Sequence, residues 1–186
     1  MEITFWHAGN KGKRGVTLER AIHIFPDIEQ VELIQSIRKK YDPLYTFIPP
    51  HITLVFPFES EITNTDLYRH VKQAITGFQP FTIRLEEITA SNGHYLFLNV
   101  KQGNDQIIAL HDKLYTGPMA IYRSYMHTYL PHLTVGRLNH EHDLKEALKD
   151  TRSFKHRFET RVSHVIAERI DHNSLSKIEF AVSFPD

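Results

Sequence analysis

A five-residue pattern that occurs twice constrains this chain most strongly. Pro50-His51-Ile52-Thr53-Leu54 and Pro131-His132-Leu133-Thr134-Val135 both read Pro-His-aliphatic-Thr-aliphatic. A proline that leads into β-branched and aliphatic residues is typical of the start of a strand. Because side chains alternate along a strand, His and Thr of each copy share one face and the aliphatic residues share the other. The pattern predicts two strands, each with a polar pair on one face and a core-facing surface on the other.

Chance does not explain the repetition. With 13 His and 14 Thr in 186 residues, about one His-x-Thr is expected at random. The preceding proline and the flanking aliphatic residues lower the expectation for the full pentapeptide to about 0.003. The alternative is that each His lies on the wet face of a half-exposed strand and each Thr is only a good strand former. Folding does not require the same polar pair twice, so a functional role is favoured.

The order of elements around the two copies also repeats. Each follows a helix and precedes a second helix and a hairpin; the helices are expected at 28–40, 63–77, 104–115 and 141–149, and the strands at 21–25, 52–58, 81–88, 94–100, 133–138, 161–170 and 178–184. Hairpins between strands favour antiparallel pairing. The sequence therefore predicts an α+β fold with two pseudo-symmetric lobes of antiparallel sheet, outer helices and a central groove.

The N-terminal stretch has a different character. Residues 1–20 show no periodicity and are predicted to form an arm without a fixed structure, whereas 21–186 form a single two-lobed domain. A translation start at Val16 or Leu18 is an alternative. The glycines between Gly9 and Gly15 fit no phosphate-binding loop, so an NTP-dependent ligase is not supported.

Composition removes several classes of protein. Lys plus Arg and Asp plus Glu both number 22, so the basic footprint of a duplex-binding protein is missing. The absence of cysteine excludes disulfides, thiolate metal sites and a cysteine nucleophile. No apolar run approaches the roughly 20 residues of a membrane span, and no signal pattern opens the chain. We expect a cytoplasmic protein without a membrane partner; its oligomeric state stays open.

Two imidazoles and two hydroxyls suit the hydrolysis of a phosphodiester. That reaction needs a base for the attacking water, an acid for the leaving oxygen, and donors to the phosphoryl oxygens. Histidine serves both proton transfers because its pKa lies near neutrality. Neither motif has further ligands at zinc spacing, so we predict no metal and no other cofactor. His140-Glu141-His142 is interpreted as a solvated helix start.

Several other residues are secondary candidates. His23 and His94 are interpreted as strand histidines, although His94 could enter the groove. Arg123 and Arg137 could each counter a phosphate charge, but Arg137 is out of phase with His132 along its strand, so a structural role is favoured for it. Four aromatic residues precede the motifs and either line the groove mouth, where one could stack on a base, or pack in the core: Tyr45, Phe47, Tyr125 and Tyr129.

The paired motifs resemble those of the 2H phosphoesterase superfamily, which includes the 2′-5′ RNA ligase and RNA cyclic phosphodiesterase families. The resemblance covers about 21–184. The runs 41–43, 48–54 and 113–117 are most similar to the YjcG-type bacterial phosphoesterases. This resemblance implies metal-independent chemistry, with His51 as proton donor and His132 as proton acceptor. Thr53 and Thr134 would then bind the phosphoryl oxygens.

Two functions follow as hypotheses. The first is a phosphodiesterase that acts on a 2′,3′-cyclic phosphate or a related RNA-end or nucleotide-derived diester. The alternative is a non-catalytic RNA or nucleotide binding module that uses the same groove. The second intact His and Thr favour the enzyme, because binding alone needs neither an acid nor a base.

Overall fold

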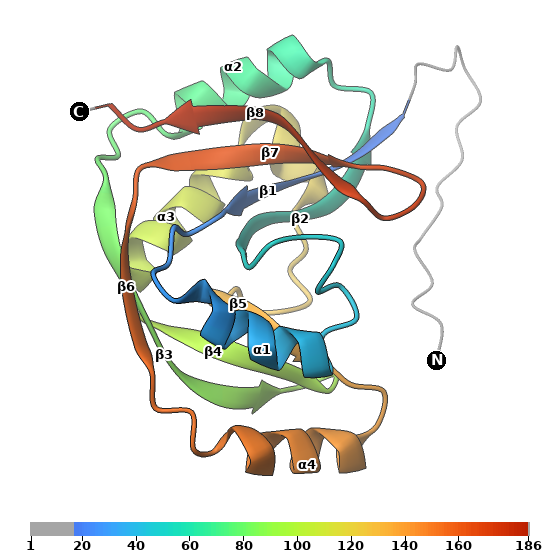
Figure 1. The fold of residues 1–186 in the computed structure, drawn as a ribbon. Helices are drawn as coiled ribbons and strands as arrows, with labels where there is room; N and C mark the ends of the chain where they lie inside the picture. The colour runs from blue at the N-terminus through green and yellow to red at the C-terminus, as the bar shows by residue number, and fades with distance from the viewer. Residues whose placement is uncertain (1–16, 186) are drawn as a thin grey trace.

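Two antiparallel sheets with helices around them make up the fold (Figure 1). The computed structural model describes residues 17–185. The strands within this range are β1 Leu18–Ile24, β2 Ile52–Ser60, β3 Phe81–Ser91, β4 Tyr95–Gln102, β5 His132–Arg137, β6 Arg157–Val162, β7 His164–Ile170 and β8 Ser176–Ser183. The helices are α1 Val31–Tyr41, α2 Asn64–Ala74, α3 Asn104–Leu114 and α4 Glu141–Thr151, with a short 3₁₀ helix at Gly117–Tyr122.

The sheets are arranged as two similar halves. One has the strand order β2-β1-β7-β8 and the other β5-β4-β3-β6. The strand that carries each pentapeptide therefore lies at one edge of its sheet, and these edge strands, β2 and β5, contact each other. This arrangement confirms the predicted α+β fold with two antiparallel lobes.

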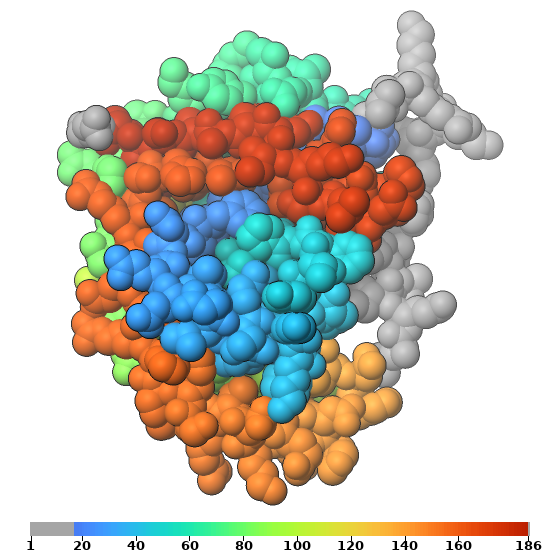
Figure 2. Space-filling model, viewed as in Figure 1, coloured from blue at the N-terminus to red at the C-terminus, as the bar shows by residue number. Residues whose placement is uncertain are grey.

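Two helices each pack on the sheet of the opposite lobe. Helix α1 follows β1 of the first sheet but packs on β5 of the second, and α3 follows β4 of the second sheet but packs on β2 of the first. Helix α2 packs on α3 and β8, and α4 on β3 and β4. Figure 2 shows α1 and the segment after it at the centre of this face, between the region of β7 and β8 and that of α4. Each motif strand is thus supported by a helix from the other half of the chain.

Several boundaries differ from those predicted. Strand β1 begins at Leu18, so Leu18–Arg20 belong to the sheet and not to the arm; residues 1–16 of the arm lie outside the described residues. Helix α1 begins after Gln30, which has a left-handed backbone, and not after Asp27. The single strand expected over 161–170 is two strands divided at Ser163, because β6 pairs with β3 and β7 with β1. The core-facing residues change phase at this point, from Phe158 and Val162 in β6 to Val165 and Ala167 in β7.

No helix in residues 17–185 is both long and apolar enough to cross a membrane.

Candidate active site

The two motifs have the predicted alternation. Ile52, Leu54, Leu133 and Val135 are at most 1% exposed. The side chains of His51, Thr53, His132 and Thr134 are half-buried. We refer to these four residues as the two-histidine site. The aliphatic residues anchor each strand in the core, which leaves the polar pair on the opposite face.

Both motif histidines make the same hydrogen bond. His51 Nδ1 lies 2.8 Å from the carbonyl oxygen of Pro49, and His132 Nδ1 lies 2.6 Å from that of Leu130. A carbonyl oxygen only accepts, so Nδ1 must carry the proton in each ring. Nε2 is then the nitrogen that can accept or donate a proton during a reaction. The carbonyl two residues earlier fixes the same tautomer in both lobes.

Side chains from the second half of the chain hold the edge of β2. Tyr129 Oη donates to the carbonyl oxygen of Thr53 at 2.8 Å. His111 Nδ1 donates to that of Leu54 at 2.8 Å, and Tyr115 Oη accepts from the amide of Phe56 at 3.0 Å. These contacts satisfy backbone groups that an edge strand leaves unpaired. They therefore fix the strand that presents Thr53.

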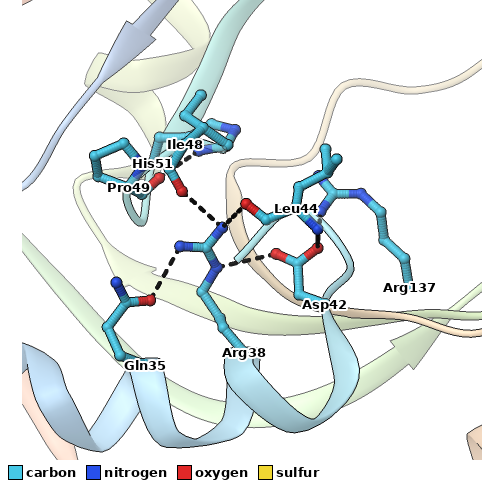
Figure 3. A network of polar contacts seen from close by, with 8 residues as sticks. All are labelled: Gln35, Arg38, Asp42, Leu44, Ile48, Pro49, His51 and Arg137. Carbon is cyan, nitrogen blue, oxygen red and sulfur yellow. Dashed lines mark hydrogen bonds and ion pairs between the residues drawn. The ribbon is translucent and has the colours of Figure 1, made fainter. Parts of the chain in front are cut away.

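A buried arginine organises the approach to the first motif (Figure 3). The Arg38 guanidinium donates to Asp42 Oδ2 at 3.0 Å and to the carbonyl oxygen of Ile48 at 2.9 Å. Asp42 also accepts from Arg137, which ends the strand of the second motif. The chain Arg38–Asp42–Arg137 thus ties the end of α1 to both motif segments.

The position of Arg137 corrects the sequence analysis. In β5, Thr134 pairs with Phe97 and Arg137 pairs with Tyr95. Three residues of β5 therefore span two residues of β4, which is the geometry of a β-bulge. The extra residue returns Arg137 to the face of His132 and Thr134, so the prediction that it is out of phase is wrong. Arg137 also makes an ion pair with Asp42, so it has a structural contact as well as a place on the face of the two motif residues.

Removing the carboxylate of Asp42 is expected to destabilise the fold. The side chains of Asp42 and Arg38 are 0% and 1% exposed, so Asp42→Ala leaves a buried guanidinium without its counterion. Such a loss costs about 3–5 kcal/mol of the free energy of unfolding, which denaturant titration would measure. Asp150→Ala is the matched control because its pair with Lys40 is more than half exposed, and it should cost much less. Equal losses in the two variants would refute this role of Asp42.

The environment keeps both motif imidazoles uncharged. Burial lowers the pKa of His51 well below its usual value, and the charges of His23, Arg137 and Arg38 lower it further, against the hydrogen bond to Pro49. Burial and the charge of Arg137 also lower the pKa of His132, against the hydrogen bond to Leu130. The guanidinium of Arg137 acts on both rings. The site therefore offers neutral imidazoles near positive charge, which suits an anionic ligand.

Acidification is expected to destabilise the protein. The pKa values of His51, His111 and His132 are all lowered by burial in the folded state. As pH falls below about 6.5, the unfolded chain takes up protons on these residues that the folded chain does not. Each such proton lowers the free energy of unfolding by about 1.4 kcal/mol per pH unit. Denaturant titrations at pH 7.5 and 5.5 should show lower stability at pH 5.5; equal or higher stability there would contradict these shifts.

The secondary candidates lie in different places. Arg123 makes a partly exposed ion pair with Asp112 at 2.6 Å. His94 is in the β3–β4 turn with a left-handed backbone and not in a strand. Tyr125 is 83% exposed, in the segment before the second motif, while Tyr129 is half-buried and stacks on His111. His23 lies with its ring centroid 4.5 Å from that of His51, a contact that the sequence analysis missed because the two are far apart in the chain.

Three further features lie outside the two-histidine site or bear on a possible metal site. Among residues 17–185, no three His, Asp or Glu side chains are grouped to hold a metal ion. His140 and His142 are exposed. An open hollow of about 1120 Å³ lies between α4 and the second sheet and contains none of the motif residues.

The comparisons with known proteins agree with this fold. Residues 25–173 match the model of the 2'-5' RNA ligase superfamily, so the chain belongs to that superfamily. A Bacillus licheniformis protein named "Putative phosphoesterase" is 29% identical over 123 residues, which cover 64% of this chain and 71% of that protein. One of the same name from Oceanobacillus iheyensis is 30% identical over 132 residues, 68% of this chain and 74% of that protein.

Solved structures of Escherichia coli LigT share the fold. The apo form has a TM-score of 0.60 at 15% identity, and the NADP+ complex has a TM-score of 0.59 at 16% identity. Each match covers 91% of this chain and 99% of LigT. Membership of the superfamily, together with the names of the Bacillus licheniformis and Oceanobacillus iheyensis proteins, supports phosphoesterase activity.

Proposed function

We propose that this protein is a metal-independent phosphodiesterase that hydrolyses a 2′,3′-cyclic phosphate or a related RNA-end or nucleotide-derived diester. The observation that carries the proposal is the matched pair of Nδ1 hydrogen bonds, which leaves Nε2 of His51 and of His132 for proton transfer. The complexes of LigT with NADP+ and with 3'-AMP support a nucleotide-derived substrate. The absence of cysteine also suits the cytoplasm.

The mechanism assigns one proton transfer to each imidazole. Nε2 of His132 accepts a proton from water as the water oxygen attacks phosphorus. The bond from phosphorus to the leaving 2′ or 3′ oxygen breaks, and Nε2 of protonated His51 gives its proton to that oxygen. The product is a phosphate monoester whose free hydroxyl carries the proton from His51, and His132 now holds the proton taken from water. Exchange with solvent restores both rings.

The remaining residues bind the phosphoryl group. The hydroxyls of Thr53 and Thr134 donate to the non-bridging oxygens, and Arg137 supplies positive charge. The negative charge of the bound diester raises the pKa of His51, which is lowered in the unliganded protein. Substrate binding thus favours the protonated form that the acid role requires.

The direct test is a substrate screen with EDTA present. We expect hydrolysis of at least one substance among nucleoside 2′,3′-cyclic phosphates, RNA with a 2′,3′-cyclic end, and ADP-ribose cyclic phosphate. Activity should be unchanged by chelation, because the proton transfers use imidazoles and not a metal-bound water. Loss of activity in EDTA and its return with a divalent ion would refute the metal-independent mechanism.

The second candidate function is a non-catalytic RNA or nucleotide binding module. The exposed side chains of Tyr125 and Leu130, next to the second motif, favour it as a surface on which a base could stack. Binding of the same ligands without turnover, together with unchanged binding in His51→Ala and His132→Ala, would support this alternative.

A further inference from the structure

A row of four polar side chains crosses the first sheet behind the two-histidine site. The row runs from His51 to His23 on β1, Glu168 on β7 and Ser176 on β8. His23 Nε2 lies 3.0 Å from Glu168 Oε1, and the Ser176 hydroxyl donates to the other carboxylate oxygen. The rings of His23 and His51 meet edge to face at 65°. His23 and Glu168 are only 3% and 1% exposed, so the row is buried behind His51.

The second lobe has a different residue at the same position. His23 pairs with Thr53 across β1 and β2, and Phe97 pairs with Thr134 across β4 and β5. Phe97 stacks on His132 with ring centroids 3.5 Å apart. The two motif histidines therefore make the same Nδ1 hydrogen bond but lie against different rings.

Packing alone does not account for His23. Phe97 demonstrates that a hydrocarbon ring fills this position against a motif histidine. Burying a histidine and a carboxylate instead costs desolvation free energy, which their mutual hydrogen bond offsets only in part. In addition, His23 Nδ1 is buried without a hydrogen-bond partner in the part of the chain that the structure describes. An orphaned polar atom beside a reactive ring indicates a functional role.

We propose that His23, held by Glu168 and Ser176, is a positioning residue that fixes the ring of His51 and makes it chemically different from His132. The proposal rests on the proposed function, because it concerns how one of the two imidazoles is prepared for proton transfer. His23 is only 3% exposed and contacts the ring of His51, so it acts through His51.

The charged groups around the two rings support this inequality. His51 faces His23 on β1, Arg38 on α1 and Arg137 on β5, and all three lower its pKa. Among these three groups, only Arg137 lowers the pKa of His132. Of these three groups, His23 is the one whose ring contacts the ring of His51 edge to face. The protonation of His51 is therefore coupled to that of His23, and His132 has no such neighbour.

The variant His23→Gln tests the proposal. The glutamine amide can still donate to Glu168, so the buried carboxylate keeps a partner and the fold should persist. NMR titration of the histidine rings, without substrate, should show a higher pKa for His51 and an unchanged pKa for His132. With a substrate from the screen, kcat should fall about 10- to 100-fold with KM little changed, as when a partner that orients a functional side chain is removed.

Controls separate this role from a structural one. His142→Gln, at an exposed position on α4, should leave both titrations and kcat as in the wild type. If His23→Gln does not fold, Glu168→Gln carries the same comparison: it is isosteric and removes the carboxylate that pairs with a positive His23, so less positive charge faces His51 and the pKa of His51 should again rise. An unchanged pKa of His51 in a folded variant would overturn the proposal. A raised pKa in a protein that hydrolyses no diester would retain the coupling and reject the proposed function.

Discussion

Replacing His132 or His51 with alanine is expected to lower kcat for diester hydrolysis by about 10²- to 10⁴-fold. Each change removes one positioned proton transfer, and transfers of this kind contribute about that much to rate. The double variant should lose less than the sum of the two logarithms, because an acid and a base that act in one step are not independent. Rates measured over pH 5 to 9 should be bell-shaped in the wild type and should lose one limb in each variant.

Other substitutions should lower kcat less than the two histidine variants do. Thr53→Ala and Thr134→Ala remove one donor to the phosphoryl oxygens each and should cost at most about 10²- to 10³-fold. His172→Ala, at an exposed turn between β7 and β8, should leave kcat unchanged. Wild-type activity in both His51→Ala and His132→Ala would eliminate acid–base catalysis by these residues and leave only the binding module.

A substrate with an activated leaving group is expected to restore most of the activity of His51→Ala but not that of His132→Ala. A p-nitrophenolate leaves without a proton, so the general acid becomes dispensable, whereas the attacking water still needs its base. The recovery should therefore approach the full 10²- to 10⁴-fold loss that His51→Ala shows with an alkoxide leaving group. Measurement of kcat for both variants with a p-nitrophenyl phosphodiester and with a cyclic phosphate gives the comparison.

The charges around His51 make this experiment a stringent test of the assigned roles. The pKa of His51 is lowered by more surrounding charges than that of His132, so His51 can act as the acid only if bound substrate supplies negative charge. Rescue of His132→Ala instead of His51→Ala would reverse the two roles while keeping the site. Equal rescue of both variants would mean that neither residue has a fixed role.

Much of the fold could be predicted because its signals are local. Alternation in Ile52–Leu54 and Leu133–Val135 predicted two half-buried strands, and both lie in the core as expected. The helix of Asn104–Leu114 begins at the predicted residue, since glycine and asparagine mark its start. The repeated order of elements predicted two lobes. The strand over 161–170 was predicted incorrectly as one element, because the change of sheet at Ser163 depends on pairing with strands that are distant in the chain.

The sequence by itself determined the two-lobed α+β fold and the candidate residues His51, Thr53, His132 and Thr134. Residue spacing within one strand or helix is enough for that, because the period of the element decides which side chains share a face. Only the tertiary structure decided what surrounds these residues: the bulge that turns Arg137 toward the face of His132, the exchange of α1 and α3 between lobes, and the row from His23 to Glu168 behind His51. Glu168 is 145 residues from His23 in the chain, and a contact of that kind depends on strand register and packing, which no local pattern encodes.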